Sequence, residues 1–201
     1  QLAAIWESMP KENLLLSVYY RPHFLKIADQ FMLSIAISLA ICDFLKKYIE
    51  NVTIKWPNDI YVGDQKIAGI LIENTLKEQK IQAAIIGIGL NVNQETFNQL
   101  PQATSMYLSA HKKFDLDPIF ECLLEQLVIQ LNKIEALAML SLKKEYESFL
   151  FRKGMISVFE DSSGKRFNGI IQGVSDQGEL EIESETHAMK TFQPKALKLL
   201  F

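Results

Sequence analysis

The spacing of apolar residues predicts a strand followed by a long helix at the start of the chain. The run NLLLSVYY, residues 13–20, is rich in apolar and aromatic side chains and stops at Arg21-Pro22, which is typical of a β-strand. From about residue 25 to residue 49, apolar residues recur at helical spacing, which predicts one long and mostly buried helix. Two further amphipathic helices are predicted over 117–131 and 137–150.

Between these helical segments the pattern is that of short strands. A strand over 52–55 is followed by Pro57, which cannot continue a ladder. Gly63-Asp64-Gln65 is a hairpin turn between two apolar runs, so an antiparallel meander is expected over 59–90. Its strands are predicted at 59–62, 66–73 and 81–90, the last buried on both faces, with a polar turn over 74–80 and a loop over 94–110.

The pattern changes after residue 151. Five short strands separated by Gly-containing turns are predicted at 156–160, 166–172, 179–183, 188–192 and 197–200. This density of strands in fifty residues indicates a small closed barrel. The expected fold is therefore α+β, with a mixed or antiparallel sheet packed with helices in domain 1–150 and a small β-barrel in domain 151–201.

Composition narrows the class of protein. The 201 residues are 48% hydrophobic and carry a net charge of −3, which argues against disorder and against attraction of the whole surface to nucleic acid or anionic membrane. Cys42 and Cys122 lie far apart in apolar helical patterns and are interpreted as reduced thiols of a cytoplasmic protein. The apolar run 31–42 is too short to span a bilayer, and no targeting segment is visible.

The hairpin carries the first candidate chemistry. Gly69 interrupts an otherwise strong strand, which often marks the close approach of a ligand to the backbone. If the two strands pair across the turn, Asp59 and Lys66 meet beside that gap, with Asn58 at its mouth. A small anion next to a metal-bound phosphate would suit such a place. An ordinary exposed hairpin with a surface Lys-Asp pair accounts for the pattern equally well.

The stretch GIGLNVN, residues 87–93, is the second candidate. It lacks the third glycine of a dinucleotide fingerprint and opens no obvious helix. Gly87 and Gly89 either relieve packing against the long helix or form a backbone wall against a flat ligand. Asn91 is either a turn residue or a donor to a purine, and Trp6 is more often a core residue than a stacking platform.

The segments KWPNDIYVGDQKIAGILIE and IIGIGLNVN together resemble the catalytic core of biotin protein ligases, also called biotin–[acetyl-CoA-carboxylase] ligases. WESMPKENLLLSVYYRP resembles the segment before the long helix in that family, and the C-terminal strands fit its small terminal domain. The resemblance covers nearly the whole chain. It implies that biotin and ATP form biotinyl-5′-adenylate, and that a lysine of a biotin carboxyl carrier protein then attacks this anhydride.

The resemblance also implies roles for single residues. Lys66 would bind the biotin carboxylate and the α-phosphate, while Asp59 with Asn58 would face the phosphates and magnesium. The remaining binding residues implied are Lys55 as added positive charge, Gly69 and Leu71 along biotin, Gly87 and Gly89 as the opposite wall, Asn91 on the adenine with Trp6 beside it, Asn13, and Gln1 on biotin.

The chain departs from the family in one segment. The family has a basic Gly-Arg-Gly-rich loop before the tryptophan, whereas here only QLAAI precedes Trp6. We expect further residues between Ala4 and Ile5 and before Gln1 in the natural protein. No DNA or membrane partner is expected, and a homodimer is possible. The alternatives are a lipoate-type ligase, which shares this core, and a non-catalytic biotin-binding homologue.

Overall fold

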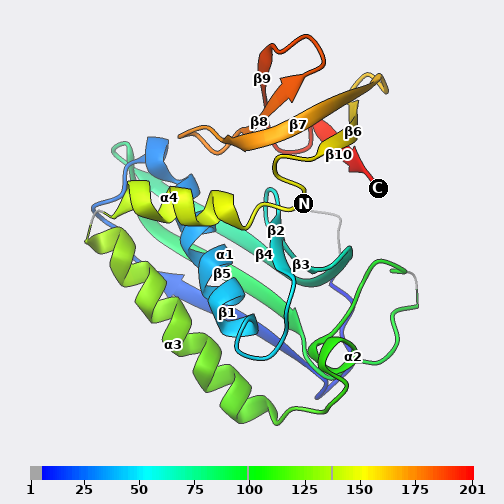
Figure 1. Cartoon of the computed structure of the whole chain (residues 1–201). Coiled ribbons are helices and arrows are strands. Elements are labelled where there is room, and N and C mark those ends of the chain that lie inside the picture. Colours follow the sequence, from blue (N-terminus) through cyan, green and yellow to red (C-terminus); the bar gives the residue numbers. More distant parts are fainter. Residues whose placement is uncertain (1–5, 99, 137) are drawn as a thin grey trace.

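The chain folds into two antiparallel sheets, with helices covering one face of the first. This arrangement is that of a computed structural model describing residues 6–98, 100–136 and 138–201 (Figure 1). Each sheet has five strands, and the second sheet lies beyond one end of the helical layer. The predicted α+β class is confirmed.

The first sheet is built from the N-terminal half of the chain. Its strands are β1 (Asn13–Tyr20), β2 (Val52–Lys55), β3 (Asp59–Val62), β4 (Gln65–Lys77) and β5 (Lys80–Asn91), in the spatial order β1-β5-β4-β3-β2. The predicted meander is therefore present, and β1 closes it on the β5 side. The register places Leu15 of β1, Gly89 of β5 and Gly69 of β4 in one row across the sheet.

The ribbon formed by β4 and β5 is longer than predicted. The polar segment assigned to a turn continues both strands, and only Glu78 and Gln79 connect them, with positive φ angles of 50° and 62°. Two left-handed residues suit the twist of a two-residue hairpin, which is why the strands reach this far. Nor is β5 buried on both faces, since the Ile85 side chain is 49% exposed.

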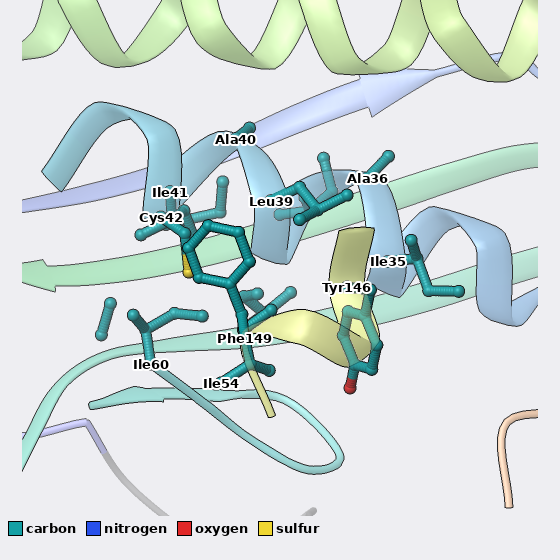
Figure 2. Close-up of a cluster of buried hydrophobic side chains, with 14 of the residues drawn as sticks. Ile35, Ala36, Leu39, Ala40, Ile41, Cys42, Ile54, Ile60, Tyr146 and Phe149 are labelled. Carbon is teal, nitrogen blue, oxygen red and sulfur yellow. The ribbon is translucent and has the colours of Figure 1, made fainter. Parts of the chain in front are cut away.

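Three helices cover one face of this sheet. They are α1 (Phe31–Leu45), preceded by the 3-10 turn Ile27–Asp29, then α3 (Leu116–Glu135) and α4 (Met139–Ser148). Nearly every residue of α1 is buried, and Figure 2 shows its side chains meeting those of β2, β3 and α4. The helix predicted over about 25–49 is present but shorter at both ends, since it begins at Phe31 and ends at Leu45. A short helix that the sequence did not predict, α2 (Met106–Ala110), begins where Ser105 Oγ accepts a hydrogen bond from the Leu108 amide.

The apolar character of α1 follows from its central position. The stretch Ile27–Leu45 has 19 residues and a mean hydropathy of 1.6, which by length and composition alone would suffice to cross a membrane. In this structure 61% of that stretch is buried against the sheet and the other helices. Burial in the protein core accounts for the same composition.

The second sheet contains all five predicted C-terminal strands. They are β6 (Ile156–Asp161), β7 (Arg166–Val174), β8 (Leu180–Ser184), β9 (Met189–Phe192) and β10 (Leu197–Leu200), in the order β10-β6-β7-β8-β9. Within residues 156–200 no ladder joins β9 to β10, so the sheet keeps two edges and the predicted barrel is not closed. Phe159 and Ile182 of this sheet are fully buried and belong to the same hydrophobic cluster as the core of the first sheet.

Side-chain contacts join the second sheet to the first part of the chain. The indole nitrogen of Trp56 donates to the Gly178 carbonyl at 2.9 Å, and Lys143 of α4 pairs with Asp176 at 2.6 Å. The two sheets fall on either side of residue 151, and a division into domains at that residue stays a prediction.

Candidate functional site

The face of the first sheet that carries no helix holds a cavity of about 850 Å³. Buried residues of β4 and β5, such as Ile70 and Ile88, point to the helices, so the alternate residues Gly69, Gly87 and Gly89 point to the cavity. These glycines make a floor of bare backbone. A cavity of this size is in the range that holds a ligand of drug size.

Lys66 and Asp59 lie together at one end of this floor. Their side chains form an ion pair with Nζ 2.6 Å from Oδ1, and both are partly exposed, at 34% and 25%. A register shift between Ile60 and Tyr61 sets β3 against the start of β4 and brings the two residues to the same end of the sheet. The predicted proximity is confirmed, and the fixed cation lies on the cavity wall.

The backbone of Lys66 is held from a second side. Its amide donates to the Gln102 carbonyl at 2.7 Å, and its carbonyl accepts from the Thr104 amide at 2.9 Å. The segment 102–104 therefore takes the place of a neighbouring strand where β5 does not reach. The position of the Lys66 side chain depends on this segment as well as on β3.

Asn91 fixes the same segment from β5. Its side chain is 3% exposed, and Nδ2 donates to the Thr104 carbonyl at 2.9 Å. Its Oδ1 has no hydrogen-bond partner among the described residues, although the residue lines the cavity. One amide thus anchors the segment next to Lys66, and its oxygen is a buried acceptor without a partner among the described residues.

Trp6 lies directly on the glycine floor. A Cβ atom added at Gly69 would come within 2.8 Å of the indole, and one added at Gly89 within 2.6 Å. Such distances leave no room for a side chain, so both glycines are needed for the indole to lie there. The hypothesis that Gly89 relieves packing against the long helix is wrong, because it faces Trp6 on the opposite side of the sheet.

Gly87 differs from the other two glycines of the floor. A Cβ atom there would meet only Leu71 atoms, at 3.6 and 3.8 Å, which are ordinary contacts. Leu71 lines the cavity as the resemblance implies, with its side chain 43% exposed. This part of the floor is open space in which a ligand could lie.

Asn58 lines the cavity but uses its amide to hold the sheet together. Nδ2 donates to the Ile70 carbonyl at 2.6 Å, while the Ile70 amide donates to the Asn58 carbonyl at 2.9 Å. This pair of bonds ties the entrance of β3 to β4. The position of Asp59, one residue further on, follows from it.

Two residues implied by the resemblance lie outside this cavity. The amide of Asn13 bonds to Ser8 at 3.1 Å and to Gln94 at 2.5 Å, and its Oδ1 accepts from the Val92 amide, so it fastens the segment before β1. Gln1, which the resemblance also implies, is not among the described residues, so its position is not stated.

Lys55 is the second residue outside the cavity. It lies opposite Asp59 in the β2–β3 register, but its Nζ bonds to the Tyr61 hydroxyl at 3.0 Å and lies 4.6 Å from the Phe201 ring. It lines a second cavity of about 500 Å³ between the two sheets. Burial lowers the pKa of the Lys55 amine, and the same burial raises the pKa of Tyr61 to about 12.

The acidic residues of the described ranges do not form a preformed metal site. Among residues 6–98, 100–136 and 138–201, no group of three His, Cys, Asp or Glu side chains could hold a metal ion. Asp59 offers one carboxylate, already paired with Lys66. A magnesium ion here would have to arrive bound to phosphates, which is the manner in which this ion is often held.

Several cavity residues were not predicted from the sequence. Leu15 and Ser17 of β1 and the segment around Phe97 and Gln102 form its walls. The alternation in NLLLSVYY could have indicated the first two, because Leu15 and Ser17 are exposed while Leu14, Leu16 and Val18 face the helices. Nothing in the sequence of the loop indicates that it lies beside Lys66.

Together the fold and the cavity define an α+β protein with a cavity of small-molecule size on the open face of its first sheet. Residues 1–91 match the model of the Biotin/lipoate A/B protein ligase family. This match, together with those to individual relatives, confirms the resemblance found in the sequence.

Individual relatives agree with this assignment. The chain is 26% identical over 198 residues to the bifunctional ligase/repressor BirA of Bacillus subtilis, covering 96% of this chain and 60% of that protein. It is 28% identical over 182 residues to the biotin–[acetyl-CoA-carboxylase] ligase of Mycobacterium tuberculosis, covering 87% of this chain and 65% of that protein. The chain therefore spans about three fifths of the length of these curated relatives.

The fold comparison covers the whole chain. The structure of biotin protein ligase from Aquifex aeolicus in complex with biotin and ATP matches with a TM-score of 0.81 and 25% identity. The match covers 100% of this chain and 83% of that chain. Both sheets therefore belong to the fold of that enzyme.

Proposed function

We propose that this protein is a biotin protein ligase, which activates biotin with ATP and transfers it to a lysine of a biotin carboxyl carrier protein. The observation that carries the proposal is the Lys66–Asp59 pair at the end of a glycine floor in the large cavity. The Aquifex aeolicus protein with this fold is described in complex with biotin and ATP, and the Mycobacterium tuberculosis relative is named a biotin–[acetyl-CoA-carboxylase] ligase.

The first half-reaction joins two anions. A biotin carboxylate oxygen attacks the α-phosphorus of ATP, the bond to the β-phosphate oxygen breaks, and pyrophosphate leaves. Lys66 supplies the positive charge that offsets the repulsion between carboxylate and phosphate, and it stabilises the charge on the phosphoryl oxygens as they react. Asp59 holds the ammonium at the cavity wall at 2.6 Å until a substrate anion replaces it.

The second half-reaction uses the open side of the cavity. The carrier lysine, as a neutral amine, attacks the acyl carbon of biotinyl-5′-adenylate, AMP leaves with the bonding electrons, and the nitrogen releases one proton to give the amide. No side chain of the floor obstructs the acyl group near Gly87, where the nearest atoms are at ordinary contact distance. Because the anhydride is readily hydrolysed, it has to be shielded from water until the carrier lysine arrives.

Recognition of the two substrates falls to different parts of the cavity. The unpartnered Oδ1 of Asn91 is a suitable acceptor for the exocyclic amine of adenine. The backbone floor at Gly69 and Gly87, with Leu71 beside it, suits a flat ring with an apolar tail. Magnesium would be held through the phosphates, with Asp59 as the carboxylate on the protein side.

The test is biotin-dependent exchange of label between pyrophosphate and ATP, followed by mass spectrometry of a carrier domain incubated with the protein, ATP, magnesium and biotin. We expect exchange and a mass increase of one biotinyl group on the carrier. Exchange with lipoate but not with biotin would instead identify a lipoate-type ligase. Biotin binding in calorimetry without any exchange would identify a non-catalytic biotin-binding protein.

The remaining properties of the family are kept as predictions. A cytoplasmic location, a homodimer and the lack of a DNA partner are expectations from the sequence. The relatives from Bacillus subtilis and Salmonella typhimurium carry the word repressor in their names, so DNA binding by the natural protein is a question for direct measurement.

A further inference from the structure

The indole of Trp6 occupies the part of the cavity that its two glycines leave free. Gly69 and Gly89 are register partners on β4 and β5. The indole lies so close to both that a Cβ atom at either position would overlap with it. The Lys66 Nζ lies 5.4 Å from the ring centroid, so the cation also faces the indole. A flat aromatic side chain thus lies on the flat floor, next to the cation proposed to act on the substrate.

The contact is favourable for the ring but leaves its polar atom unpaired. Trp6 Nε1 is buried and has no hydrogen-bond partner among the described residues. A buried indole N–H normally finds an acceptor, and leaving it without one is costly. The indole is therefore held by packing of its ring against the glycine floor and not by a hydrogen bond. A ligand that packs on the floor and also pairs its polar groups can replace it.

The segment that carries Trp6 is fastened close behind it. Residues 6–9 form no helix or strand, and the Met9 amide donates to Gln94 Oε1 at 3.1 Å, while Ser8 bonds to the Asn13 amide. Gln94 is fully buried. The segment is thus anchored at Ser8 and Met9, and Trp6 lies beyond this anchor in a stretch without helix or strand hydrogen bonds.

We propose that Trp6 is a gate that closes the glycine floor in the absence of substrate, and that the bicyclic ring of biotin binds there only after the indole has left. The inference rests on the proposed function for the identity of the ligand. Only molecules in which the floor is free can bind biotin. The apparent dissociation constant is therefore the intrinsic one divided by the fraction of such molecules.

The closed form is tested first without any ligand. In a Trp56→Phe background Trp6 is the one remaining tryptophan of the sequence, and acrylamide quenching reports its exposure. Gly89→Ala should raise the quenching constant at least twofold, because the new Cβ would lie 2.6 Å from the indole. Gly87→Ala is the matched control on the same strand and face, and it should leave quenching unchanged because its Cβ meets only Leu71 atoms at 3.6 and 3.8 Å.

A second readout does not depend on the fold tolerating Trp56→Phe. The difference in quenching between the unsubstituted protein and Trp6→Phe isolates the Trp6 signal in the natural background. Equal quenching of Trp6 with and without Gly89→Ala, in either format, would overturn the closed form.

The gate is then tested with biotin alone, so that adenine cannot contribute. Biotin should increase the exposure of Trp6, and Trp6→Ala should lower the dissociation constant for biotin on the order of tenfold, since a buried aromatic contact favours the closed form by a factor of that size. If Trp6→Ala leaves biotin affinity unchanged or weakens it, Trp6 is a platform for the ligand and the gate is refuted. If neither protein binds biotin in calorimetry, the proposed function fails and the gate for biotin fails with it, which is a different result from binding with an unmoved indole.

Discussion

Lys66 Nζ lies 2.6 Å from Asp59 Oδ1, and both side chains border the same cavity. The pair joins β3 to β4 at the point where their register shifts. Because both groups are partly exposed, the pair adds little to the stability of the fold, on the order of 1 kcal/mol or less. Its value is in holding one ammonium group at a defined place beside the glycine floor.

Replacing Lys66 should therefore separate activity from stability. We expect Lys66→Ala to lower the rate of biotin-dependent pyrophosphate exchange by about a hundredfold or more, as for the loss of other groups that stabilise developing charge. The free energy of unfolding in urea should change by less than about 1 kcal/mol. Lys77→Ala, an exposed lysine further along β4, is the matched control and should leave both quantities unchanged. Normal exchange by Lys66→Ala would remove this lysine from the mechanism.

Asn91 should be important for both stability and nucleotide binding. Asn91→Ala removes the donor to the buried Thr104 carbonyl at 2.9 Å and should lower the free energy of unfolding by about 1–3 kcal/mol, the usual cost of an unpaired buried group. It should also raise KM for ATP, through the lost acceptor Oδ1, and lower kcat, because the segment 102–104 that holds the Lys66 backbone loosens.

The control for Asn91 is an asparagine with a weaker bond on the neighbouring strand. Asn74 Nδ2 lies 3.4 Å from Gln30 Oε1, and Asn74→Ala should cost less stability and change neither kinetic constant. A variant Asn91→Ala with unchanged kcat and a raised KM would show that Asn91 only binds the nucleotide and does not position Lys66.

The sequence predicted the strands and the Lys66–Asp59 proximity because both depend on local pattern. The hairpin turn at Gly63-Asp64 and the period-two alternation set the pairing of β3 with β4, and the pairing brings the two charges together. The same reasoning overlooked α2, because five residues are too few to show a helical period. It also ended β4 early, because residues 75–77 are exposed and show no alternation of buried and exposed positions.

Contacts between side chains from segments far apart in the chain could not be predicted from the sequence pattern. Trp6 and the glycine floor are separated by more than sixty residues, and only the fold places them in contact. The resemblance implies that Lys55 adds positive charge to the site, yet its amine contacts Tyr61 and Phe201 and lies at the second cavity. Asn13 lies at the start of β1, and its side-chain amide donates a hydrogen bond to Gln94, 81 residues further along the chain. The sequence pattern does not reveal this contact.

Tyr146 tests the packing behind the sheet. Its ring lies edge-to-face with Phe31 at 5.7 Å, it is fully buried, and its hydroxyl has no hydrogen-bond partner among the described residues. Burial also raises the pKa of this phenol. Tyr146→Phe should leave the free energy of unfolding unchanged or raise it by up to about 1 kcal/mol, because it removes a buried polar atom and keeps the ring. Tyr146→Ala should cost about 3–5 kcal/mol through the cavity it leaves.

Urea denaturation of both Tyr146 variants measures this difference. A loss of more than about 1 kcal/mol in Tyr146→Phe would show that the hydroxyl is bonded in solution. Circular dichroism of the two folded variants serves as the control that the helices around Phe31 are retained.

Lys55 gives a prediction about pH. Burial lowers the pKa of its amine below the usual 10.5, with Lys66 and Lys198 acting in the same direction and Asp59 opposing them. The unfolded chain therefore binds the Lys55 proton more tightly than the folded protein does. The resulting destabilisation is fully present below the lowered pKa, and it disappears as the pH rises to 10.5 and above.

The prediction concerns the difference in free energy of unfolding between the unsubstituted protein and a Lys55 variant, because groups that titrate equally in both proteins cancel in this difference. The free energy of unfolding of the unsubstituted protein, minus that of Lys55→Met, should become more positive as the pH rises from 7 to 10.5. Lys77→Met, at an exposed position, should show no such trend. A difference for Lys55→Met that stays flat or falls over the same range would mean that the amine is hydrated in the second cavity, and that the contact with the Tyr61 hydroxyl at 3.0 Å does not persist in solution.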